Sequence, residues 1–243
     1  MFSEYDVFMF LESYCNNAAG KINFTRQQAS DFAKKIADDF NPLHDVDAKR
    51  FCVPGDLLFS LTLEKSGLSQ EMKFTFSGMV NDGIDLIFPE SIESHAAIVD
   101  ENNKEYLTVN VSGNNTKSMT TISSLTKAYV EFSGQTFPHI LVALMAENNV
   151  MINPTRPMVM YESMTIHLDT LDFNDVKLAL ATSTLSIDGK RGVADLIFNL
   201  VSNGKKIGHG KKHMLLSGLR PYEQSVIDSI VKEYNDKKAK FIA

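Results

Sequence analysis

The sequence predicts an α+β fold in which antiparallel strands wrap a long apolar helix, and it predicts this arrangement twice. One apolar helical segment, residues 54–66, begins with a Pro-Gly pair, and a second, residues 137–149, has a proline at its start. Each is followed by strands that alternate apolar and polar residues between turn segments. Because a helix that is apolar around most of its circumference must be buried, we expect the strands to cover it.

The length and composition predict two units of similar size. The chain has 243 residues, of which 44% are hydrophobic and 22% are charged, as in a globular protein. We place the units at residues 1–125 and 126–243. Two such units can join their sheets edge to edge, which removes two exposed strand edges.

Several kinds of location and partner are not expected. No apolar run approaches 18 residues, so we expect no transmembrane helix. The first 15 residues lack a basic segment and a small-residue cleavage site, so we expect no signal peptide. Cys15 and Cys52 are far apart, which is typical of reduced thiols in a cytoplasmic protein. The net charge of -6 and the absence of a basic stripe argue against nucleic-acid binding.

Local signals place the other elements. A helix is predicted at residues 25–37, because Thr25 and Gln28 have capping-box spacing and apolar residues follow with helical periodicity. The β-branched segment 119–132 is predicted to be a strand, and residues 221–240 a solvated C-terminal helix. Hairpin turns are predicted at Asn81–Gly83, Glu101–Lys104, Asp188-Gly189 and Asn203-Gly204.

The stretch DDFNPLH, residues 38–44, places an acid and a base on either side of a turn. Asp39 and His44 are five residues apart, so an Asn-Pro turn can direct both side chains to one water. Asn41 can fix that turn by accepting hydrogen bonds from nearby amides. Gly55, at the start of the next helix, offers an N–H to a substrate oxygen. The simpler alternative is a helix exit with a surface Asp and a structural His.

Residues 32–61 resemble the MaoC-like (R)-specific 2-enoyl-CoA hydratases, which have the hotdog fold. Their Asp-x-Asn-Pro-x-His signature is matched by Asp39, Asn41, Pro42 and His44, and their helix-opening glycine by Gly55. The resemblance implies a double hotdog, with the site in the first unit and a degenerate second unit. A homodimer is compatible with this interpretation.

The resemblance also implies an activity. Asp39 and His44 would be the catalytic residues that add water to a 2-enoyl-CoA to give an (R)-3-hydroxyacyl-CoA. Asn41 and Gly55 would be substrate-binding residues. The partner would be an acyl-CoA or acyl-carrier thioester, and neither a cofactor nor a metal is implied.

Alternatives remain open. The segment between His44 and Gly55 is shorter than in typical hydratases, which favours a non-catalytic protein that binds acyl-CoA or acyl carriers. A thioesterase would use the same fold. His209 and His213 share a strand face, either as metal ligands or as exposed strand residues. Four lysines near one hairpin would contact coenzyme A phosphates or simply be solvated; they are Lys205, Lys206, Lys211 and Lys212.

Overall fold

A ten-stranded antiparallel sheet curves around two helices in the computed structural model, which describes residues 11–242. The strand order is β1-β2-β4-β5-β6-β3-β8-β11-β10-β9. The first six strands in the chain are β1 (Asn16–Ala18), β2 (Lys21–Asn23), β3 (Leu68–Phe76), β4 (Leu86–Ile87), β5 (His95–Asp100) and β6 (Glu105–Thr116). The others in this sheet are β8 (Val159–Leu168), β9 (Lys177–Asp188), β10 (Arg191–Ser202) and β11 (Lys205–Ser217).

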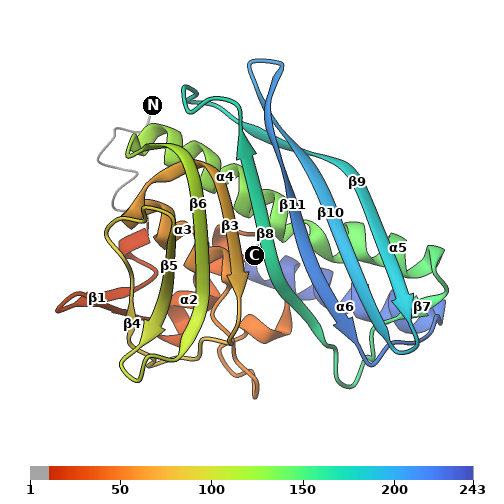
Figure 1. Ribbon diagram of the computed structural model, residues 1–243. Helices are drawn as coiled ribbons and strands as arrows, with labels where there is room; N and C mark the ends of the chain where they lie inside the picture. Colours follow the sequence, from red (N-terminus) through yellow and green to blue (C-terminus); the bar gives the residue numbers. More distant parts are fainter. Residues whose placement is uncertain (1–10, 243) are drawn as a thin grey trace.

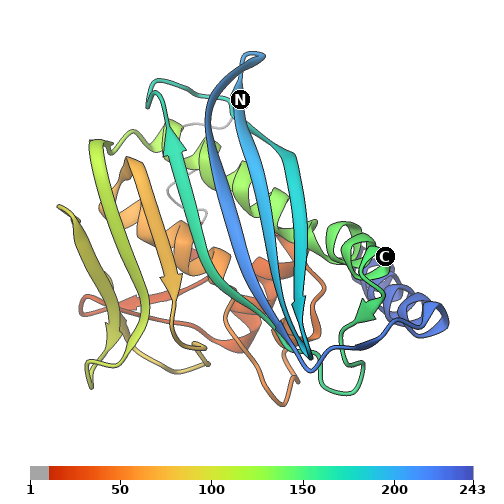
Figure 2. The same ribbon diagram turned by 45° about the vertical axis from the view of Figure 1, so that its right-hand side comes forward.

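The helices lie on one face of this sheet (Figures 1 and 2). They are α2 (Arg26–Lys35), α3 (Gly55–Ser66), α4 (Met119–Gly134), α5 (Leu141–Glu147) and α6 (Gln224–Ile242), with two short turns of helix, η1 (Pro42–His44) and η2 (Thr136–Ile140). A separate small sheet pairs β7 (Val150–Met151) with β12 (Arg220–Pro221). The expectation about a signal peptide concerns mainly residues 1–10, which lie outside the described residues.

The two halves of the chain repeat one arrangement. In the first, α3 is followed by β3, β4, β5 and β6, which lie in the spatial order β4-β5-β6-β3. In the second, α4 is followed by β8, β9, β10 and β11, which lie in the equivalent order β9-β10-β11-β8. The halves meet where β3 pairs antiparallel with β8, from Glu71 opposite His167 to Thr75 opposite Ser163. The predicted joining of the two sheets is therefore confirmed.

Helix α3 is buried on nearly all sides, as its sequence predicts. Its apolar residues are all buried; they are Leu57, Leu58, Phe59, Leu61 and Leu63. Gly67 ends the helix with a φ of 87°, a conformation that favours glycine. Helix α4 packs against α3, and the rings of Phe59 and Tyr129 lie 4.7 Å apart between centroids. The core is thus centred on these two helices, under the curved sheet.

The prediction of a strand at residues 119–132 is wrong, because this segment forms α4. Ser118 caps the helix by accepting a hydrogen bond from the Thr121 N–H. Its buried apolar residues recur at helical spacing, and burial against the sheet outweighs the strand preference of β-branched residues. The central helix of the second half is therefore α4. Residues 137–149, expected to form this helix, instead contain most of η2 and the short helix α5. The expected boundary between residues 125 and 126 falls inside α4.

Other local predictions have mixed outcomes. The hairpin turns at Glu101–Lys104, Asp188-Gly189 and Asn203-Gly204 are confirmed, since they join β5–β6, β9–β10 and β10–β11. Asn81–Gly83 does not form a hairpin, because β3 pairs with β6 and β8, whereas β4 pairs with β2 and β5. The connecting segment instead packs on the entry to α3, where the Val53 N–H donates to the Val80 carbonyl.

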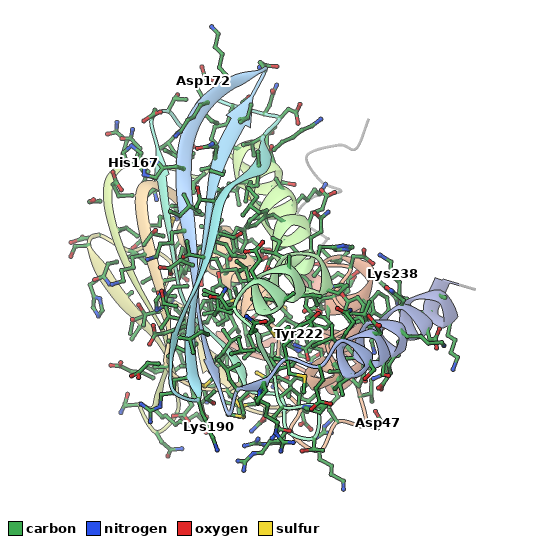
Figure 3. All side chains as sticks on the ribbon, turned by 90° about the vertical axis from the view of Figure 1, so that its right-hand side faces the viewer. Asp47, His167, Asp172, Lys190, Tyr222 and Lys238 are labelled. Atoms are coloured by element: carbon green, nitrogen blue, oxygen red, sulfur yellow. The ribbon has the colours of Figure 1, made fainter. Side chains whose placement is uncertain are left out.

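The predicted capping box of α2 is confirmed, with Thr25 and Gln28 bonded reciprocally. The predicted C-terminal helix is confirmed as α6, which buries Tyr234. Figure 3 shows this helix on the side away from His167, which lies on the outer face of the sheet. Among the described residues, no helix is long and apolar enough to cross a membrane.

Candidate functional site

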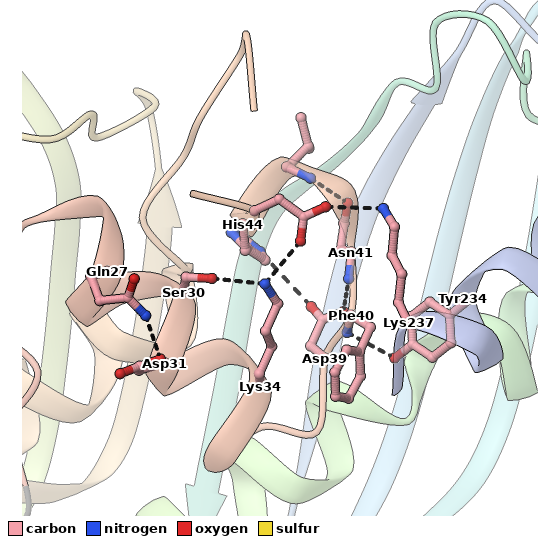
Figure 4. A network of polar contacts seen from close by, with 12 residues as sticks. Gln27, Ser30, Asp31, Lys34, Asp39, Phe40, Asn41, His44, Tyr234 and Lys237 are labelled. Atoms are coloured by element: carbon pink, nitrogen blue, oxygen red, sulfur yellow. Dashed lines mark hydrogen bonds and ion pairs between the residues drawn. The ribbon is translucent and has the colours of Figure 1, made fainter. Parts of the chain in front are cut away.

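The stretch DDFNPLH forms a turn that its own side chains hold in place (Figure 4). The carboxylate Oδ1 of Asp39 accepts a hydrogen bond of 2.9 Å from the Asn41 N–H. The side-chain oxygen of Asn41 in turn accepts one of 3.1 Å from the Leu43 N–H, at the start of η1. Asn41 therefore fixes the turn, as its position predicts.

This turn brings Asp39 and His44 together. His44 Nδ1 lies 2.6 Å from the Cys52 carbonyl oxygen, and since a carbonyl only accepts, Nδ1 carries the proton in the neutral ring. The unprotonated Nε2 then faces Asp39 Oδ2 at 3.8 Å. This distance is longer than a hydrogen bond, so both atoms can still contact a third group between them. The side chains of His44 and Asp39 are 13% and 26% exposed, which leaves the pair partly open to solvent.

The turn rests on the second half of the chain. A Cβ atom at Gly134, the last residue of α4, would lie 1.5 Å from the Ala37 carbonyl oxygen, so the two backbones are in direct contact. On the other side, the Tyr234 hydroxyl donates to the Asp38 carbonyl at 3.1 Å and accepts from the Phe40 N–H at 3.2 Å. Helices α4 and α6 thus hold the backbone on both sides of Asp39.

Charged neighbours separate the roles of the acidic residues. The carboxylate of Asp38 pairs with Lys238 of α6. Asp45 pairs with Lys34 at 2.9 Å and with Lys237 at 3.0 Å. Burial, the largest single effect, raises the pKa of the Asp45 carboxyl, but the hydrogen bonds and positive charges of Lys34 and Lys237 together lower that pKa below its ordinary value. Of these acids, only Asp39 faces the histidine.

Gly55 begins α3 beneath two aromatic rings. Pro54 supplies no side-chain cap to the helix, so the first N–H groups of α3 have no capping side chain. A Cβ atom at Gly55 would lie 3.1 Å from the ring of Phe76 and 3.2 Å from that of Tyr161. The two rings are 4.5 Å apart between centroids. A Cβ atom here would be a tight contact, and the two rings would have to move by a few tenths of an ångström to accept it.

Four polar side chains that no sequence motif indicates lie near Gly55. Asp56 and Lys212 are buried, as are the hydroxyls of Tyr129 and Tyr161, which bond to each other. The assignment of Lys212 to an exposed basic group is wrong. A strand alternation would have placed Lys212 on the inner face, because Met214 and Leu216 of the same strand are also buried. Asp56 and Lys212 are too far apart in the sequence to suggest a pair.

The histidines of β11 lie on the outer face. His213 Nδ1 is 2.5 Å from Asp195 Oδ1, and its Nε2 is 3.1 Å from Glu162 Oε2. These carboxylates come from the neighbouring strands, β10 and β8. Over residues 11–242, no group of three or more His, Cys, Asp or Glu residues has an arrangement that could hold a metal ion. His209 lines one of two hollows on the surface, but neither hollow is lined by Asp39, Asn41, His44 or Gly55.

Comparisons with solved structures found chains with low sequence identity. One is a putative thioesterase II from Thermobifida fusca YX, with 8% identity and a TM-score of 0.46, covering 86% of this chain and 97% of that chain. Another is the tesB protein of Mycobacterium avium subs paratuberculosis, with 9% identity and a TM-score of 0.45, covering 88% and 99%. A third is a MaoC-like dehydratase, with 10% identity and a TM-score of 0.41, covering 85% and 99%.

The search of curated proteins found no match. A family model described as "Protein of unknown function (DUF3581)" matches residues 9–225, which is most of the chain. The chain therefore belongs to the DUF3581 family.

Proposed function

We propose that this chain is a double hotdog that acts on acyl thioesters, and that it hydrates a 2-enoyl thioester to an (R)-3-hydroxyacyl thioester. The pairing of Asp39 with a His44 ring whose tautomer is set by the Cys52 carbonyl is the observation that supports this activity. The two repeated helix-and-strand arrangements support the two units, which we propose to meet at the connection between β6 and α4. Free thiols at Cys15 and Cys52 support a cytoplasmic location.

The chemistry follows from the pair. A water bound between Asp39 Oδ2 and His44 Nε2 would give one proton to the pair as its oxygen bonds to C3 of the substrate. The pair would return a proton to C2, so the enzyme ends unchanged. The N–H of Gly55, at the positive end of α3, would stabilise the negative charge that develops on the thioester oxygen.

A hydration assay tests this proposal. Crotonyl-CoA is mixed with the protein, and loss of the enoyl thioester absorbance is followed. Asp39→Asn and His44→Gln should each lower kcat by about 10²- to 10⁴-fold, the usual contribution of general acid–base catalysis. Asp38→Asn is the matched control, since Asp38 is adjacent but points to Lys238. The proposal fails if the wild type does not hydrate enoyl thioesters, or if Asp39→Asn is as active as the control.

The same geometry suits a second activity. If the thioester carbonyl oxygen is held by the Gly55 N–H, a water activated by Asp39 and His44 can attack the carbonyl carbon instead of C3, as in a thioesterase. Release of free thiol from butyryl-CoA, which has no double bond, would identify this reaction. A protein that only binds thioesters would show a higher Tm with butyryl-CoA, with neither hydration nor thiol release.

A further inference from the structure

A buried lysine next to the candidate site has no part in the chemistry described above. Lys212 is only 5% exposed. Its Nζ donates to Ser133 Oγ at 2.6 Å and to Thr136 Oγ1 at 3.4 Å, and it lies 4.6 Å from the centroid of the Tyr161 ring. Lysine is almost never buried this deeply without a charged or polar partner, so its surroundings call for an explanation.

A buried carboxylate with an unused oxygen lies nearby. Asp56, in the first turn of α3, is 8% exposed, and its Oδ1 has no hydrogen-bond partner within the described part of the chain. A buried acceptor without a donor destabilises the fold. In native proteins such groups usually bind a water, an ion or a ligand. Oδ1 can therefore accept a hydrogen bond from a bound molecule.

Several contacts connect these two residues to the candidate site. The ring of Tyr161 contacts both Gly55 and the Lys212 ammonium. Ser133, which binds Lys212, directly precedes Gly134, whose backbone touches the segment that leads to Asp39. Asp56 follows Gly55 in the chain. The acid, the base, the helix N-terminus and the buried pair therefore border one region.

The electrostatic effects agree with this placement. Burial is the main reason that the pKa of Asp56 is raised, and the positive charge of Lys212 opposes that rise. Burial lowers the pKa of Lys212, which the negative charges of Asp56 and Asp39 oppose. Each group therefore stabilises the charged form of the other.

We propose that Asp56 and Lys212 bind a hydroxyl group on the acyl chain, so that the substrate is a short acyl thioester hydroxylated beyond C3. This inference rests on the proposed function. A hydroxyl can accept a hydrogen bond from the ammonium and donate one to Asp56 Oδ1. A methyl group would leave Asp56 Oδ1 without a hydrogen-bond donor, and a carboxylate would bind Lys212 but be repelled by Asp56. A long apolar chain is disfavoured because the region is lined by charged and hydroxyl groups.

Three thioesters of equal chain length test the specificity: crotonyl-CoA, trans-4-hydroxy-2-butenoyl-CoA and fumaryl-CoA, which end in a methyl, a hydroxymethyl and a carboxylate group. Their Kd values are measured by calorimetry on the Asp39→Asn variant, which binds with little turnover. We expect the hydroxylated thioester to bind at least about tenfold more tightly than the other two, as expected for a site that hydrogen-bonds a hydroxyl.

Two variants test the residues. Asp56→Asn and Lys212→Met, each combined with Asp39→Asn, should bring the ratio of Kd values for crotonyl-CoA and the hydroxylated thioester to about one. The control, Lys211→Met, removes an adjacent lysine that pairs with Asp195, and it should leave the ratio unchanged. If the pair were only structural, both variants would weaken binding of all three thioesters equally, and that result would overturn the inference.

The outcomes separate the two proposals. Equal binding of the methyl and hydroxymethyl thioesters, together with hydration of crotonyl-CoA by the wild type, would overturn the specificity and leave the hydratase intact. If none of the three thioesters binds or reacts, the proposed function fails and the inference fails with it.

Discussion

The contact between Gly134 and Ala37 makes a strong prediction about a single methyl group. Gly134→Ala places a Cβ atom 1.5 Å from the Ala37 carbonyl oxygen and 2.7 Å from its carbonyl carbon. An ordinary contact needs about 3.4 Å, so the two backbones must separate by about 2 Å. Neither atom belongs to a flexible side chain that could rotate away. The segment that carries Asp39 therefore has to move.

The magnitude follows from two opposing effects. Alanine is preferred over glycine in a helix by about 1 kcal/mol, which favours the variant. Overpacking costs about 1–3 kcal/mol, and we expect the upper end because backbone meets backbone. The net loss of about 2 kcal/mol corresponds to a decrease in Tm of about 4–8 °C for a chain of this size. A shift of Asp39 by 1 Å or more should also lower hydration by about a hundredfold.

The assays are thermal unfolding followed by circular dichroism, and hydration of crotonyl-CoA. The control is Gly192→Ala in β10, where the nearest atoms are the methyl ends of Leu219, Leu185 and Ile187 side chains. That variant should change Tm by much less. If Gly134→Ala is as stable as the wild type, or more stable, helix propensity dominates and the close approach of α4 to the Asp39 turn is refuted.

Two further predictions concern titrating groups. The pKa of Asp45 is lower in the folded protein than in the unfolded chain. Its ion pairs with Lys34 and Lys237 therefore stabilise the fold fully above about pH 4. This stabilisation is lost as the pH falls through the folded-state pKa of Asp45. In urea unfolding, the difference in stability between wild type and Asp45→Asn should shrink from about pH 6 to about pH 3; a constant difference would contradict this. Burial raises the pKa of the Cys15 and Cys52 thiols to about 11. Because the thiolate reacts, both should react slowly with a disulfide reagent near pH 8 and rapidly in urea; fast labelling of the folded protein would show that they are not buried.

Local signals in the sequence are sufficient to predict several structural features of the first half of the chain. The capping box at Thr25 and Gln28 lies within one helical turn, and the Asp39–His44 pair lies within one loop, so spacing alone predicts both. Helix α4 was missed because its threonines and isoleucine favour strands by themselves. Only the sheet that covers it, built from residues later in the chain, provides the burial that makes it a helix.

The buried pair could not be predicted for a different reason. Asp56 and Lys212 influence each other electrostatically because the β3–β8 pairing joins the second half of the chain to the first. A lysine in a strand is normally solvated, so its charge predicts an exposed side chain. The alternation of the strand instead places Lys212 on the same face as Met214 and Leu216, which are buried. Sequence periodicity gives the direction of a side chain, whereas the fold decides what it faces.

The continuous sheet has a consequence for how this chain can change over time. In a symmetric dimer of two identical subunits, each substitution appears at both equivalent sites. Here Asp39 and Asp56 belong to one half, whereas Gly134 and Lys212 belong to the other. The two halves can therefore accumulate different substitutions. Asp56 and Lys212, which we propose to bind the hydroxyl group, lie in different halves, so a chain cut between β6 and α4 would lose this arrangement if the two pieces came apart.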